Sequence, residues 1–212
     1  MSKIKIQNLA GMSLIEMMMA IAIFAIGLAG FSQLFINAWR NNSYTIEMGE
    51  SAFAASRGVN KAVEYVRKAR QGDDGSYPVK SVGNSDLVLY CDYDNDQTTE
   101  RLHFYLSTGT FFMGVTDPTS GFPKTYPTGD EQAIVLATRI VNTSSDPLFY
   151  YYNNNYPGDT THNPLTSPID VTAVRLVKIR LKININPNRA PDNIEMESFA
   201  ELRNLNDYAG VQ

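Results

Sequence analysis

An acidic residue, Glu16, lies in the apolar stretch of residues 12–36, which is otherwise interrupted only by Ser13, Ser32 and Gln33. A carboxylate inside an apolar membrane span costs about 2.5–3.5 kcal/mol on insertion scales and therefore needs a partner. Gly11 directly precedes this stretch, and cleavage after it would expose the amine of Met12. One helical turn separates Met12 from Glu16, so the new cation can approach this carboxylate or its equivalent on a neighbouring subunit. The spacing predicts an ion pair that proteolysis creates.

The apolar stretch is long enough to cross a membrane. As a helix rising about 1.5 Å per residue it spans roughly 37 Å, which exceeds a hydrocarbon core of about 30 Å. Lys3 and Lys5 precede it, which predicts a cytoplasmic N-terminus and an outward-facing remainder. A secretory signal peptide is cut after its apolar run, whereas Gly11 comes before this one. Cleavage at Gly11 therefore leaves the anchor attached.

Residues 11–16 read Gly-Met-Ser-Leu-Ile-Glu and are followed by the apolar helix. This segment resembles the cleavage and methylation signature of type IV prepilins and pseudopilins. The resemblance implies that prepilin peptidase cuts between Gly11 and Met12 and methylates the Met12 amine, although Met12 stands where the family most often has phenylalanine. It also implies that Glu16 guides docking of the subunit into a growing filament. The competing interpretation is a plain signal anchor with an accidental buried acid.

Four segments are expected along the chain: a cleaved leader (1–11), a transmembrane and filament-core helix (12–36), an amphipathic continuation of this helix (37–71) and an extracytoplasmic β-rich domain (72–212). In the continuation, apolar and mostly small residues recur at steps of four and three, which predicts one buried helix face. This face packs on the sheet of the same chain or forms a coiled-coil seam with another subunit. Its residues are Met48, Ala52, Ala55, Val59, Ala62, Val66 and Ala69.

Beyond residue 75 the hydrophobic period changes to two, which predicts β-strands. Residues 87–93, 100–106 and 110–115 form an expected meander, and residues 177–185 form a hairpin with the strand that begins at 194. The fold class is therefore α+β, a long N-terminal helix packed on an antiparallel sheet domain, as in the lollipop shape of pilins.

The hairpin alternates apolar residues with basic ones on its first strand and with acidic ones on its second. To keep both apolar sets on one face, paired residues must have numbers that sum to an odd value. Such a register can set Arg180 opposite Glu201. The basic stripe is therefore better explained by acids on the neighbouring strand than by a polyanionic ligand.

An acidic turn contains Asp92, Asp94 and Asp96 and leads to Glu100. Clustered carboxylates suit hard cations, and this alternate spacing copies the opening of a calcium-binding EF-hand loop. The glycine and the closing glutamate of such a loop are missing. The turn is therefore either a calcium site or the solvated end of a hairpin, and the protein requires no cofactor.

Several function classes are disfavoured by composition. The net charge of -4 argues against nucleic-acid binding. The single cysteine, Cys91, cannot form an internal disulfide, and the apolar alternation around it predicts a buried thiol. The only histidines, His103 and His162, are far apart in sequence and have no nearby nucleophile arrangement, so we do not expect an enzyme.

Short motifs beyond the helix resemble J-type minor pseudopilins and W-type minor pilins; they are residues 92–96 with 100–101, residues 146–151 and residues 201–205. This resemblance implies a structural minor subunit that helps to initiate or cap a type II secretion pseudopilus. Its place is the bacterial cytoplasmic membrane, and later the filament. Its partners are prepilin peptidase, other pilin or pseudopilin subunits and membrane lipid.

Two alternatives remain. The first is a minor pilin of a type IV pilus that serves adhesion, motility or DNA uptake, and the second is a membrane-tethered sensor or solute-binding domain. The aromatic and asparagine-rich segment 149–156 also has two interpretations. It either exposes rings and amides to a partner or sugar, or forms a strand whose rings pack inward before an asparagine-rich turn.

Overall fold

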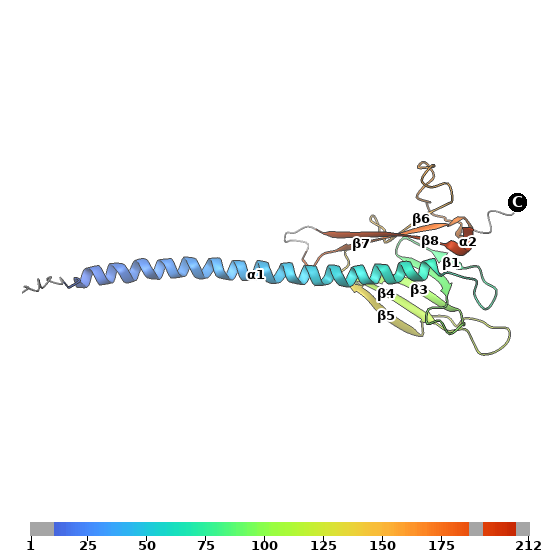
Figure 1. Ribbon diagram of the computed structural model, residues 1–212, viewed down its shortest axis with the longest axis horizontal. Coiled ribbons are helices and arrows are strands. Elements are labelled where there is room, and N and C mark those ends of the chain that lie inside the picture. Colours follow the sequence, from blue (N-terminus) through green and yellow to red (C-terminus); the bar gives the residue numbers. More distant parts are fainter. Residues whose placement is uncertain (1–10, 187–192, 207–212) are drawn as a thin grey trace, which may run out of the picture. The chain divides into compact units, whose positions relative to one another are not determined.

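The computed structural model describes residues 11–186 and 193–206 (Figure 1). Its first element is the long helix α1, Leu14–Arg67. The chain divides into one unit that ends at Ile46 and a second that begins at Glu47, so α1 contributes to both. The predicted leader falls almost wholly on residues 1–10, which lie outside the described residues.

In the first unit, α1 carries the predicted apolar stretch. Every residue from 11 to 36 is exposed, including the large side chains of Leu14, Phe24 and Leu34. Exposed apolar side chains in such number do not suit water, because burial of apolar surface is the main favourable term in folding. This part of the helix therefore requires lipid or another subunit around it.

The second unit contains two antiparallel sheets. The five-stranded sheet has the order β1 (Val79–Val82), β2 (Asp86–Cys91), β3 (Glu100–Ser107), β4 (Thr110–Thr116) and β5 (Gln132–Thr138). The three-stranded sheet has the order β6 (Phe149–Tyr152), β7 (Leu176–Ile183) and β8 (Ile194–Glu201). A short 3-10 helix, η1 (Val171–Ala173), precedes β7, and the four-residue helix α2 (Arg203–Asn206) follows β8. The predicted meander is confirmed as β2, β3 and β4, and the α+β fold class is confirmed with it.

The C-terminal part of α1 packs on these sheets. In Figure 1, strands β3 to β5 lie along one side of this part of the helix and β7 with β8 along the other. One hydrophobic core joins residues of the helix and of both sheets. Six of the seven predicted face residues are buried and Ala52 is half-buried, so packing on the chain's own sheets is confirmed.

The helix ends at Arg67 and not at residue 71. The backbone N–H of Ala69 donates to the carbonyl of Val66, which tightens the last turn. The N–H of Arg70 then leaves the helix and donates to the carbonyl of Tyr90, 2.9 Å away, at the end of β2. A tertiary hydrogen bond thus replaces the helical one, and local sequence does not reveal it.

The hairpin register differs in part from the prediction. Paired residues on β7 and β8 do have numbers that sum to an odd value, and the apolar sets share one face. However, Arg180 is opposite Glu197, and the predicted pairing of Arg180 with Glu201 is wrong. Glu201 is opposite Leu176 at the other end of the hairpin.

Candidate functional site

The N-terminal end of α1 holds the predicted assembly carboxylate. The Ser13 backbone N–H and the Ser13 hydroxyl both donate to Oε2 of Glu16, at 2.9 and 3.1 Å. In return, the backbone N–H of Glu16 donates to Oγ of Ser13 at 3.3 Å. This reciprocal pairing is a capping box, in which a serine and a glutamate three residues later satisfy free donors at a helix start. The chain therefore begins its helix where Ser13 and Glu16 meet.

Sequence reasoning had assigned the Met12 amine as the partner of Glu16 and had missed Ser13. The signal was present, because serine followed three residues later by glutamate before an apolar run is a helix-start pattern. Gly11 and Met12 lie just before α1 and are exposed. Cleavage between them, methylation of Met12 and the ion pair with Glu16 stay predictions.

The helix behind this cap meets the length and polarity needed to cross a membrane. Within the described residues, α1 is the one helix of this kind, and its most apolar window of 18 residues has a mean hydropathy of 2.2. None of that window is buried within the protein. The helix can therefore serve as an anchor.

The acidic turn forms the second candidate site, and the structure gathers three of its four predicted residues. One carboxylate oxygen each from Asp92, Asp94 and Glu100 lie within 4.8 Å of one another. Asp96 is not part of this group. Its Oδ1 accepts a hydrogen bond from the backbone N–H of Thr98 at 2.7 Å. The structure thus brings three of the four predicted residues together and leaves Asp96 apart from them.

Glu100 is the buried member of the cluster, with 2 % of its surface exposed. Its Oε2 accepts a hydrogen bond from the backbone N–H of Tyr93 at 3.0 Å. Burial, and then the nearby carboxylates of Asp94 and Asp96, raise the pKa of the Glu100 side chain to about 7. A buried carboxyl group therefore titrates near neutral pH at this turn.

Arg70, three residues beyond the end of α1, contacts the acidic turn. Its guanidinium donates to the carbonyls of Gln97 and Thr98 and to the hydroxyl of Thr99, at 2.8–3.0 Å. Nη1 of Arg70 also lies 3.4 Å from Oδ2 of Asp92. The turn thus has a cation of its own chain on one side, which sequence reasoning did not anticipate.

The cluster fits the size of a calcium ion but not its full ligand set. Oxygens bound to one calcium at about 2.3–2.6 Å lie within about 5 Å of one another, as these three do. Calcium takes about six to eight oxygens, so backbone carbonyls and water would have to supply the others. Arg70 beside Asp92 opposes a second cation. Calcium binding at this turn stays a prediction.

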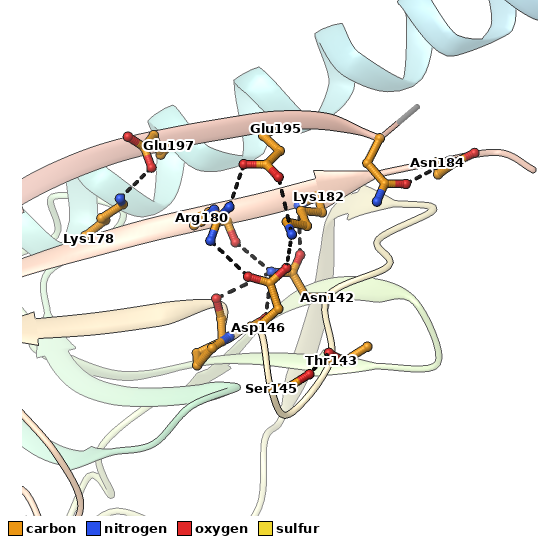
Figure 2. Close-up of polar contacts among 12 residues, drawn as sticks. Asn142, Thr143, Ser145, Asp146, Lys178, Arg180, Lys182, Asn184, Glu195 and Glu197 are labelled. Atoms are coloured by element: carbon orange, nitrogen blue, oxygen red, sulfur yellow. Dashed lines mark hydrogen bonds and ion pairs between the residues drawn. The ribbon is translucent and has the colours of Figure 1, made fainter. Parts of the chain in front are cut away.

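The solvent face of the three-stranded sheet carries the predicted basic stripe, and acids of the same chain balance it (Figure 2). Arg180 pairs with Asp146 at 2.9 Å and with Glu195 at 2.6 Å, and Lys182 pairs with the same two acids. Because Glu195 lies on β8, these ion pairs link β7 to β8. The hydrogen bonds from Arg180 and Lys182 lower the pKa of the Glu195 carboxyl. The interpretation of the stripe as a solvated, balanced face is confirmed.

The side chain of Asn142 hydrogen-bonds to the edge of β7 past the point where its pairing with the short strand β6 ends (Figure 2). Its side-chain oxygen accepts from the backbone N–H of Lys182 at 2.8 Å, and its nitrogen donates to the carbonyl of Arg180 at 3.0 Å. The amide thus makes the two hydrogen bonds that a residue of a neighbouring strand would make. The same side-chain nitrogen also donates to the carbonyl of Asp146 at 3.2 Å, which helps to hold Asp146 against the sheet.

The other side chains that could take part in a reaction, those of the cysteine and the two histidines, are buried or paired within the chain. Cys91 is buried, and burial raises the pKa of its thiol to about 12, which leaves it unreactive near neutral pH. His103 pairs with Asp130 at 3.0 Å, and His162 pairs with Asp159 at 2.8 Å in a separate loop.

The aromatic segment follows the second of its two interpretations, a strand whose rings pack inward, while contact with a partner or sugar stays a prediction. Phe149 and Tyr151 on β6 are buried, as expected for a strand with inward rings. Tyr152 lies on the other face, where Tyr156 and Phe199 cover it with ring centres 4.4 and 6.1 Å away. Strand formation is confirmed, and the outward rings mainly fasten the asparagine-rich turn.

Comparison with known proteins gives one match, at the N-terminus. Residues 7–32 match the family model described as the prokaryotic N-terminal methylation motif. No curated protein and no solved structure matches the chain significantly. The matched segment includes Gly11, Met12, Ser13 and Glu16. The motif therefore supports a type IV pilin-like family, whose members are structural rather than catalytic, and together with the exposed apolar helix it supports membrane anchoring.

Proposed function

We propose that this chain is a structural minor subunit of a type II secretion pseudopilus, where it helps to initiate or cap the filament. One observation carries the proposal: the methylation motif coincides with the start of a long, exposed apolar helix whose first turn holds Glu16. A filament core supplies apolar surroundings for this helix and a positive terminus for the acid.

The processing steps follow from the same segment. Prepilin peptidase removes residues 1–11 by cutting between Gly11 and Met12, and then methylates the Met12 amine. The basic leader keeps the N-terminus in the cytoplasm, and the β-rich domain lies outside the bacterial cytoplasmic membrane. Other pilin-type subunits and membrane lipid are the partners of the apolar helix.

Assignment to the minor, J-type group rests on the short motifs of the domain. Several of these residues hold the fold together: Glu100 and Arg101 are buried, Asp146 joins the ion network, and Leu202 and Leu205 lie in the core. Residues with such structural roles are the ones that domains of one related group would have in common.

A minor pilin of a type IV pilus is the second candidate, and one loop favours it. Residues 153–163 expose polar side chains on a braced scaffold, since the buried Asn163 donates to the side chain of Asn153 and to the carbonyl of Asp159. A braced polar loop suits recognition of an external surface. Deletion of the chain should abolish protein secretion if the pseudopilus role is right, and adhesion or motility if the pilus role is right.

Replacement of the acid tests the filament role itself. Glu16→Leu should leave membrane insertion normal, because it makes the span more apolar, and should remove the subunit from sheared filaments. Gln33→Leu, in the same stretch, is the matched control and should assemble normally. Normal incorporation of the Glu16→Leu subunit would contradict the proposal and favour a membrane-tethered sensor or solute-binding domain.

A further inference from the structure

A groove lies between α1 and the free edge of the five-stranded sheet, within the second unit. It has a volume of about 360 Å³, and its lining on the helix side includes the small residues Ala54 and Gly58. The edge strand β5 forms the opposite wall, where Val135 is 54 % exposed. Phe53, directly before Ala54 on α1, is 72 % exposed. Large exposed apolar side chains thus lie in or next to a groove that small helix residues help to line.

Two cations line the same groove without an acidic partner in the described part of the chain. Arg57 and Lys61 are four residues apart on α1, so they lie on one ridge of the helix together with Phe53. The ammonium of Lys61 lies 5.9 Å from the centre of the Tyr65 ring, and no carboxylate of the described residues forms an ion pair with it or with Arg57. By contrast, Lys68, which directly follows the helix, pairs with Glu64 near the helix end. Two neighbouring cations with no acidic partner give this groove a local positive charge, which is complementary to an acidic surface.

The groove cannot receive an added β-strand along its whole length. Gly58 approaches β5 so closely that a Cβ atom built on it would lie 2.5 Å from the carbonyl oxygen of Leu136. The backbone of β5 is therefore covered by α1 at Leu136, where the pairing with β4 is also irregular. An occupant must use its side chains and not a continuous backbone ladder.

We propose that this groove binds an acidic helix of a different pilin-type subunit. Acidic residues four apart on such a helix have Cβ atoms about 5–6 Å from each other, the same spacing that the helix gives Arg57 and Lys61. Apolar side chains of the same helix cover Phe53 and Val135. This inference rests on the proposed function, because it names the neighbour that the subunit meets in the filament.

Charge reversal tests the contact in cells that express the full-length chain. The double variant Arg57→Glu with Lys61→Glu should lower the amount of subunit in sheared filaments about tenfold, since it replaces two attractive contacts by repulsive ones. Lys80→Glu with Arg203→Glu makes the same change in net charge on other surfaces and should assemble normally. Leader cleavage and the thermal midpoint should stay normal in both doubles. Equal incorporation of the two doubles would overturn the inference.

Cross-linking identifies the occupant. A photoreactive amino acid at Val135 should form an adduct in cells with another pilin-type subunit, identified by mass spectrometry, through a peptide that contains acidic residues four apart. The Arg57→Glu and Lys61→Glu changes should abolish this adduct. Adducts only with a second copy of this chain, or adducts that survive charge reversal, would overturn the inference. A chain absent from all filaments, with its leader intact, would instead refute the proposed function.

Discussion

Ser13 and Glu16 satisfy each other's hydrogen bonds at the first turn of α1, with the serine N–H and hydroxyl both directed at one carboxylate oxygen. The carboxylate is thus held against its own helix before any partner arrives. A held carboxylate has fewer orientations to lose when it meets a positive terminus. Ser13 therefore positions the carboxylate to which the proposed function gives the assembly role.

Removal of the Ser13 hydroxyl should weaken assembly without preventing processing. Ser13→Ala keeps one of the three hydrogen bonds, so we expect several-fold less subunit in sheared filaments, while Ser13→Thr should restore the wild-type amount. The measurement is quantitative blotting of sheared and membrane fractions. Equal amounts for Ser13→Ala and wild type would show that the capping box does not matter for assembly.

Asn142→Ala should destabilise the domain by about 1–3 kcal/mol, because it leaves the N–H of Lys182 and the carbonyl of Arg180 without partners. Chemical denaturation of the full-length protein in detergent measures this change. Ser145→Ala, which removes only an exposed hydrogen bond to Thr143 in the same loop, should change stability by less than about 0.5 kcal/mol. Similar effects of both variants would contradict the strand-like role of Asn142.

The buried Glu100 should make stability fall as pH rises. Its pKa is raised from 4.5 to about 7, so between these values the folded state binds more protons than the unfolded state. Stability is therefore lost from about pH 4.5 to 7, by at most roughly 3 kcal/mol. Glu100→Gln keeps an acceptor for Tyr93 and should remove this loss when unfolding is measured in chelator. A wild-type curve that rises over this pH range relative to that of Glu100→Gln would contradict the assignment.

Calcium should raise the thermal midpoint if the acidic turn binds it, because a ligand that binds only the folded state stabilises it. We expect a higher midpoint in millimolar calcium than in chelator, and no such difference for Asp94→Asn. Asp96→Asn is the matched control, since Asp96 lies outside the cluster and its variant should keep the shift. An unchanged wild-type midpoint, or an equal shift in Asp94→Asn, would refute calcium binding here.

Periodic patterns in the sequence predicted the elements that repeat a simple rule. The apolar face of α1 and the meander β2 to β4 follow steps of 3.6 and 2, and the structure has both. The edge strand β1 was missed because four residues are too few for a clear period. The helix end was misplaced because the Arg70 N–H bonds to Tyr90, a contact that depends on the folded domain.

The candidate sites likewise contain residues that a local sequence pattern reveals and contacts that depend on the folded domain. Glu16 was found because an acid in an apolar stretch is conspicuous, and its local partner Ser13 could have been found from the capping pattern. The contact of Arg70 with the acidic turn joins residues distant in sequence, as does that of Asp146 with Arg180. Such contacts depend on how sheets and loops pack, which no local pattern encodes.

The mass of the N-terminal peptide of the mature chain, recovered from membranes, tests the central claim most directly. The account predicts a peptide that begins with N-methylated Met12 and still contains Ser13 and Glu16. A chain that begins at Met1, or one that has lost the apolar stretch together with the leader, would contradict it.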